Sequence, residues 1–140
     1  MSVPKGQRAE SPFELQVMAD DFVVHTIRIM SNEKVFDPRY SALADRVVDT
    51  AIDALVCLEA ANDIYVNDDP SRWAERRSLQ VRACSELMKL KTLLRVCRST
   101  YHLRRGKYEH WAGLLRDTLA TARKWRDSDA KRNRHLSSGQ

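Results

Sequence analysis

The stretch that decides the fold is ACSELMKLKTLLRVCRSTY, residues 83–101. Its apolar side chains recur at alternating steps of four and three residues, which is the spacing of one face of an α-helix. They are Ala83, Leu87, Leu90, Leu94, Cys97 and Tyr101. A seam of this kind packs against neighbouring helices at shallow crossing angles. The stretch therefore predicts a long helix inside a helical bundle.

Three prolines indicate where helices begin. Each follows a residue suited to cap a helix N-terminus, in the pairs Ser11-Pro12, Asp37-Pro38 and Asp69-Pro70. With the apolar periodicity, they predict helices over 12–30, 38–65, 71–102 and 107–127. Because short connections favour antiparallel neighbours, we expect an all-α, up-down-up-down four-helix bundle.

The chain of 140 residues has the length of one domain. We expect the bundle to occupy residues 12–127, with a disordered segment at 1–11 before it and a basic flexible tail at 128–140 after it. The second helix has a second apolar row, Val48, Ile52 and Val56, beside its main stripe. Such a wide apolar sector suits a central helix or one that also meets another subunit.

Composition excludes several classes of protein. Four glycines and four prolines are too few for a β-sandwich or barrel with its frequent turns. No apolar run approaches the ~20 residues of a membrane span, and the first residues lack the apolar core of a secretory signal. The three cysteines are an odd number without C-x-x-C spacing, which indicates a reducing compartment. We therefore expect a cytoplasmic protein without membrane association.

The sequence contains no recognisable catalytic or metal-binding motif. Its glycines are isolated, so none forms a phosphate-cradling loop. Cys57, Cys84 and Cys97 fall on or beside apolar stripes, where a free cysteine behaves as a small hydrophobe. His25 and His110 are isolated histidines, and neither belongs to a set of ligands with metal-binding spacing. We expect a protein that is not an enzyme and that has no catalytic residues, no metal and no cofactor.

The distribution of charge is the strongest functional signal. Residues 1–70 carry 6 Lys and Arg against 13 Asp and Glu, whereas residues 71–140 carry 18 against 6. A split this steep gives one half of the chain a strong positive field. Arginine predominates among these cations, and its planar guanidinium suits phosphate groups and the faces of bases.

The cations of the second half therefore predict a surface that binds nucleic acid. The candidate residues are Arg76, Arg77, Arg82, Arg95, Arg98, Arg104, Arg105, Lys107, Arg116, Arg123, Lys124 and Arg126. Tyr101, Tyr108, Trp111 and Trp125 are interleaved among them and have the π-faces on which bases stack. For Trp111 and Trp125, on the apolar face of the last helix, we expect core packing instead.

Several stretches of this chain resemble one protein family. They are SNEKVFDPRY at 31–40, VVDTAID at 47–53, Trp73 with RRSLQVRA at 76–83, YEHW at 108–111 and WRDSD at 125–129. The resemblance is to the accessory variability determinant proteins of diversity-generating retroelements. Their superfamily includes four-helix proteins encoded in intervening sequences of bacterial large-subunit rRNA. That second branch carries an Asn-Ile-Ala-Glu-Gly stretch where this chain has Glu59-Ala60-Ala61-Asn62, which favours the retroelement branch.

The resemblance implies a homopentameric barrel with a positively charged surface. It also implies that the partners are a reverse transcriptase and its template RNA or cDNA during mutagenic cDNA synthesis. Two alternatives remain open at this point. One is a structural protein-interaction bundle whose acidic and basic faces dock head to tail, and the other is an rRNA intervening-sequence protein.

Overall fold

The computed structural model describes residues 12–32 and 34–137. Within them, four long helices are connected by short loops: α1 (Pro12–Met30), α2 (Ser41–Asn62), α3 (Pro70–Tyr101) and α4 (Arg105–Arg132), with a last turn α5 (Arg134–Ser137). The described residues contain no strand. This confirms the all-α prediction. The disordered segment predicted at 1–11 and the last residues of the predicted tail, 138–140, lie outside the described residues.

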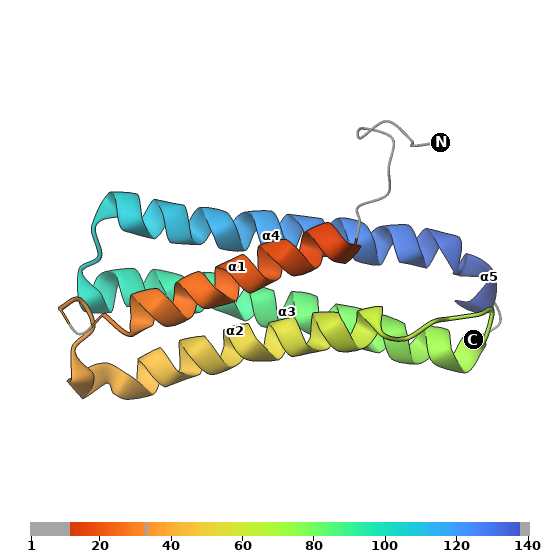
Figure 1. Cartoon of the computed structure of the whole chain (residues 1–140), viewed down its shortest axis with the longest axis horizontal. Coiled ribbons are helices and arrows are strands. Elements are labelled where there is room, and N and C mark those ends of the chain that lie inside the picture. Colours follow the sequence, from red (N-terminus) through yellow and green to blue (C-terminus); the bar gives the residue numbers. More distant parts are fainter. Residues whose placement is uncertain (1–11, 33, 138–140) are drawn as a thin grey trace.

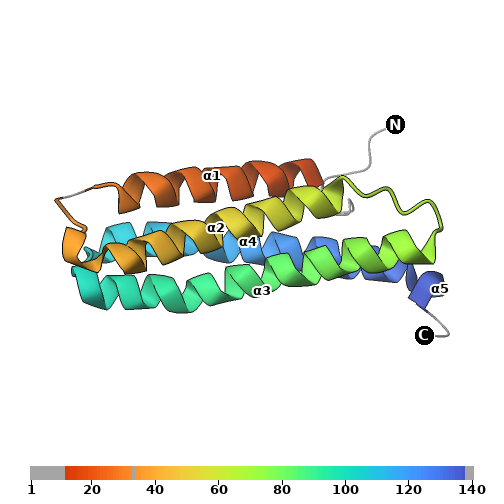
Figure 2. The same ribbon diagram turned by 90° about the horizontal axis from the view of Figure 1, so that it is seen from below.

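The helices form an elongated bundle in which each long helix is antiparallel to the next (Figure 1). Contacts close a ring, because α1 packs on α2 and α4, and α3 packs on α2 and α4. Seen from below, α1 and α2 lie on one side of the bundle, and α5 lies beside the beginning of α3 (Figure 2). The 32 residues of α3 make a rod of about 48 Å, which spans the molecule.

The predicted seam of α3 is confirmed, since all six of its residues are buried. The predicted face of α4 is likewise buried, and both Trp111 and Trp125 belong to the core as expected. The three cysteines are buried and unbridged, which agrees with their predicted role as core side chains. Trp111 also donates a hydrogen bond from Nε1 to Thr26 Oγ1 at 3.0 Å, which ties α4 to α1 inside the core.

Two predicted helix boundaries need correction. The helix predicted over 38–65 is a 3₁₀ turn, Pro38–Tyr40, followed by α2, which ends at Asn62. Asp37 caps the 3₁₀ turn by accepting from the Arg39 amide, so the cap was assigned correctly and the helix type was not. Beyond α2, Asn67 and Asp68 adopt left-handed backbone angles, which a continued α-helix excludes.

The boundary of the predicted tail was wrong. We expected the bundle to end at residue 127, whereas α4 continues to Arg132 and the chain then forms α5. The reason is Asp129, whose side chain is only 3% exposed and accepts at 2.7 Å from Arg76 Nε and at 2.8 Å from Gln80 Nε2 of α3. A carboxylate buried among its donors holds this last stretch of helix against α3.

Arg76 joins three parts of the chain at this end of the bundle. Besides Asp129, it donates from Nη1 to the Ile64 carbonyl at 2.9 Å, which fixes the loop between α2 and α3. Its guanidinium carbon also lies 5.1 Å from the centre of the Trp125 ring, within the range of a cation–π contact. We call Arg76, Gln80, Trp125 and Asp129 the polar clamp.

Removal of one partner should show how much the polar clamp contributes to the stability of the fold. We predict that Asp129→Ala lowers the free energy of unfolding by about 3 kcal/mol, because it leaves the guanidinium of Arg76 buried without its carboxylate. Asp127→Ala is the matched control, since its ion pair with Arg126 is at the surface and should contribute under about 1 kcal/mol. Urea denaturation would measure both, and equal losses would contradict a special role for the clamp.

Candidate nucleic-acid interface

The structure distributes the predicted cations over different faces of the bundle. Arg76 was predicted to contact nucleic acid, but its side chain is only 13% exposed and is held by Asp129. Its charge is therefore neutralised in the interior, and Arg76 leaves the candidate set. Arg82 lies near Cys57 of α2, on the other side of α3 from α4. Arg77 borders a separate cleft with Trp73 of α3 and Ser137 of α5.

A second group of candidates lies at the turn from α3 to α4. Arg104, Arg105 and Lys107 are all exposed there, as expected of a turn. Arg105 is partly neutralised, because its Nε donates to Glu109 Oε1 at 2.8 Å. That pair holds the pKa of Glu109 below its usual value and raises the pKa of Arg105. Two further candidates, Arg95 on α3 and Lys124 on α4, are exposed along their helices.

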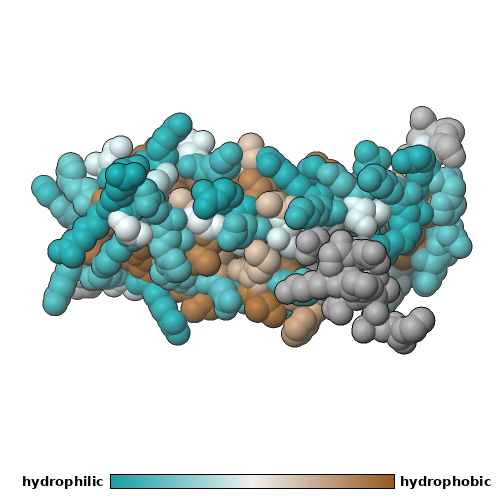
Figure 3. Space-filling view, turned by 90° about the horizontal axis from the view of Figure 1, so that it is seen from above, coloured by the Kyte–Doolittle hydropathy of each residue, from teal (hydrophilic) through white to brown (hydrophobic). Residues whose placement is uncertain are grey.

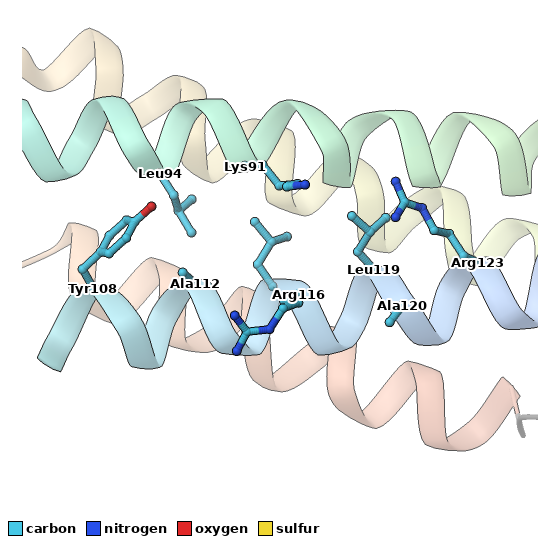
Figure 4. A pocket seen from close by; sticks show the side chains of 9 residues that line it. Lys91, Leu94, Tyr108, Ala112, Arg116, Leu119, Ala120 and Arg123 are labelled. Carbon is cyan, nitrogen blue, oxygen red and sulfur yellow. The ribbon is translucent and has the colours of Figure 1, made fainter. Parts of the chain in front are cut away.

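The main convergence of charge lies between α3 and α4, in a groove of about 270 Å³. Its lining residues are Lys91, Leu94, Tyr108, Ala112, Leu115, Arg116, Leu119, Ala120 and Arg123. Tyr108 and Arg123 extend from α4 toward α3 at the two ends of this groove, and Leu94 and Leu119 point into the space between them (Figure 4). The groove thus combines an apolar floor with a cationic rim.

Contacts between the two helices place further cations at the rim. The guanidinium carbon of Arg98, on α3, lies 4.8 Å from the centre of the Tyr108 ring. Arg123 Nη2 donates to the sulfur of Met88 across the same seam at 2.7 Å. Arg126 of α4 lies next to Cys84 of α3, so it extends the set of cations that lie between the two helices. We call Lys91, Arg98, Arg116, Arg123 and Arg126 the groove cations.

The groove cations have little neutralisation from the protein itself. Arg126 pairs with Asp127 at 3.1 Å. For the other four, no carboxylate of residues 12–32 and 34–137 lies within ion-pair distance. Positive charge that is concentrated and unpaired on a surface attracts polyanions and raises their association rate. The apolar floor adds surface on which a base or sugar can pack.

Lys91 is the groove residue that the predicted set left out. It follows Leu90 of the buried seam directly and so flanks that seam on the side of α4. The sequence signal was available, because any residue next to a seam position lies at the border of the buried face. Only the packing of α3 on α4 shows which border meets Arg116 and Arg123.

Tyr108 differs from the two tryptophans. It is half-buried at the end of the groove beneath Arg98, and it packs against the core at the same time. Tyr101 is buried at the opposite edge of α3, where its hydroxyl donates to the Tyr40 carbonyl at 2.8 Å. Of the four interleaved aromatic residues, only Tyr108 therefore borders the groove.

A comparison of the chain with known protein families, with curated proteins and with solved structures finds no match. Function therefore has to be inferred from the residues themselves. Among the described residues, no three His, Cys, Asp or Glu side chains are grouped so as to hold a metal ion. None of the helices over the same residues combines the length and the apolar character that a bilayer crossing requires.

The buried thiols make the stability of the protein depend on pH in the alkaline range. Burial raises the pKa of the Cys97 thiol from 9.0 to about 12. In the unfolded chain the thiol ionises near pH 9, whereas the folded protein holds its proton to higher pH, so folding is opposed by rising pH in this window. We predict that stability falls between about pH 9 and pH 12. Urea midpoints measured at both ends of that range would test it.

Lysine and tyrosine side chains titrate in the same range, so a variant is needed as control. Cys97→Ala lowers stability at all pH values because it leaves a cavity in the core. It should also reduce the alkaline loss of stability, since it removes one of the three buried thiols, while Cys57 and Cys84, whose pKa burial also raises, keep their contributions. An unchanged pH dependence in this variant would contradict the assignment to Cys97.

Proposed function

We propose that this protein is a non-enzymatic nucleic-acid-binding bundle that assists the reverse transcriptase of a diversity-generating retroelement. The observation that carries the binding is the α3–α4 groove, with its cationic rim and apolar floor. The groove cations come from two helices and are spaced along them, so they suit a phosphate backbone and not a single small anion. The retroelement setting rests on the sequence resemblance alone, and the cytoplasm is proposed with it.

The bound nucleic acid is single-stranded or locally unpaired template RNA or cDNA. A shallow groove with cations along the rim favours contacts to phosphates, which carry no sequence information. The flanking Tyr108 and the leucine floor accept the π-face or edge of any base. We therefore expect binding that tolerates changes in sequence and weakens steeply with salt, because each neutralised phosphate releases condensed counterions.

The structure also supports the proposal that the protein is an oligomer. On α2, Ile52 is 37% exposed and Val56 is 55% exposed, and on α1, Val17 and Val24 are also more than two-fifths exposed. In the view onto α1 and α4, apolar (brown) side chains lie between polar (teal) ones, most of them in the lower half, where α1 runs (Figure 3). Repeated apolar exposure on adjacent helices is typical of a protein interface. A homopentamer is the assembly that the resemblance implies.

Binding by the groove can be tested with a charge-reversal variant. We predict that Lys91→Glu with Arg116→Glu and Arg123→Glu weakens binding to every single-stranded oligonucleotide. The slope of log K against log salt should fall by about 2 to 3, since roughly 0.7 to 0.9 is lost per phosphate contact. Fluorescence anisotropy over a range of salt concentrations would measure it, with circular dichroism to verify folding.

A matched control separates the groove from net charge. Lys34→Glu with Arg39→Glu and Arg46→Glu changes the charge by the same amount outside α3 and α4, at exposed positions. It should leave most of the binding intact. Equal losses in both variants would contradict a groove-specific site. If the wild type forms its oligomer but binds nothing at about 50 mM salt, the head-to-tail interaction bundle replaces this proposal.

The proposed oligomer can be tested independently of nucleic-acid binding. We predict that light scattering gives a mass several times the 16.2 kDa of one chain. Ile52→Glu with Val56→Glu should reduce it toward a monomer, because charges at a buried interface are costly to desolvate. The thermal melt of the separated chain shows whether the bundle itself survives. A wild-type mass of about one chain would contradict the oligomer.

A further inference from the structure

A second cationic site lies on the opposite side of α4 from the groove. An open cavity of about 540 Å³ separates the last turns of α1 from the first turns of α4. Its lining residues are His25, Arg28, Ile29, Asn32, Gly106, Lys107 and His110. None of them lines the α3–α4 groove. The cavity is therefore a separate feature of the bundle.

Two histidines from different helices meet in this cavity. The rings of His25 on α1 and His110 on α4 lie edge to face, with centroids 5.1 Å apart and an angle of 81°. Burial lowers the pKa of His25, and the charges of His110 and Arg28 lower it further. Protonation of His25 is therefore opposed while the cavity holds no negative charge.

Apart from Ile29 and Gly106, the residues that line the cavity with the histidines are cationic or polar. Arg28 comes from α1 and Lys107 from α4, and no carboxylate of residues 12–32 and 34–137 is among the lining residues. Asp21 lies one turn before His25 on α1 but does not line the cavity, and Glu109 is engaged by Arg105. Over residues 12–32 and 34–137, neither Arg28 nor Lys107 has an ion-pair partner.

Helix stabilisation explains only part of this arrangement. Arg28 is in the last turn of α1, where a cation interacts favourably with the helix dipole. Lys107 is in the first turn of α4, where a cation is unfavourable, and that turn contains no acidic residue. Four groups that carry or can acquire positive charge thus converge around one cavity without any compensating anion from the described chain.

We propose that this cavity binds the dianionic phosphate of a phosphomonoester. Arg28 and Lys107 supply fixed charge, Asn32 supplies a neutral donor, and the two imidazoles supply donors that become charged when the anion arrives. Binding is therefore linked to protonation, because a bound dianion favours the charged form of a neighbouring imidazole. The phosphate comes either from a mononucleotide-sized molecule or from the 5′ end of a strand. The cavity is large enough for a sugar beside it.

Proton resonances of the histidine rings test this without any substitution. The chain has four histidines, and His102 and His135 lie outside the cavity, so they serve as internal references. Sulfate is the first probe, because its charge stays constant from about pH 5.5 to pH 8, the range in which histidine titrates. At constant ionic strength set by chloride, sulfate should raise the pKa of His25 and His110 by roughly half a unit or more, equivalent to about threefold tighter binding on protonation.

His102 and His135, the internal references, show whether the effect of sulfate is specific to the cavity. If His102 and His135 shift as much as His25 and His110, or if none of the four shifts, the proposed site is wrong. Arg28→Gln should abolish the sulfate-induced shift of His25, while Lys34→Gln, an exposed change in the α1–α2 loop outside the cavity, should preserve it. A shift that persists unchanged in Arg28→Gln would likewise overturn the proposal.

The source of the phosphate is resolved with three further probes on the wild-type protein. They are uridine monophosphate and one trinucleotide with either a 5′-phosphate or a 5′-hydroxyl. Shifts with the monophosphate support a small ligand, and shifts with the phosphorylated trinucleotide alone support a strand end. Equal shifts with the 5′-hydroxyl trinucleotide would overturn recognition of a monoester. The groove variant should keep all these shifts, so failure of this site and failure of the groove are distinguishable.

Discussion

The ion pair between Arg76 and Asp129 is the constraint on which one end of the molecule depends. It joins α3 to the last turns of α4 at 2.7 Å, and the same guanidinium holds the Ile64 carbonyl of the loop before α3. Without it, the helical turns after residue 127 would have only Ala130 and Leu136 as apolar side chains to hold them on the bundle. A buried pair costs much desolvation, so it persists where several donors share the carboxylate, as Gln80 does here.

The middle of the bundle was predictable from the sequence because burial there follows helical period. Leu87, Leu90 and Leu94 on α3, and Trp111 and Leu115 on α4, are apolar residues at regular steps, and all are buried. The ends were less predictable because they depend on single polar contacts. Asp129 looks like one more charge in a basic tail, and periodicity carries no signal that a carboxylate will be buried against an arginine 53 positions earlier.

The positive charge of the candidate interface was predictable from the sequence, but the surface of the bundle on which each cation lies was not. Arginines spaced along a helix of 32 residues project in several directions, and the sequence does not say which neighbour covers each direction. The packing of α3 on its neighbours places Arg98 on the side of α4, Arg82 on the side of α2 and Arg76 in the interior. For the same reason, His25 and His110 have no visible partner in the sequence, since they lie 85 positions apart and meet only where α1 packs on α4.

The two cationic sites share α4 as their common wall. Arg116 and Arg123 line the groove on the α3 side of α4, whereas Lys107 and His110 line the cavity on its α1 side. Both sites need small residues on α4, because Ala112 and Ala120 leave the leucine floor of the groove open and Gly106 adds no side chain to the cavity. Negative charge is concentrated on the other side of the bundle, where α1 contains Glu14, Asp20 and Asp21 and α2 contains Asp45, Asp49, Asp53 and Glu59. A polyanion is therefore attracted more to α4 than to α2. A basic helix with small residues at its borders thus concentrates positive charge while keeping apolar surface accessible beside it, and that combination is what the proposed contact with phosphates and bases requires.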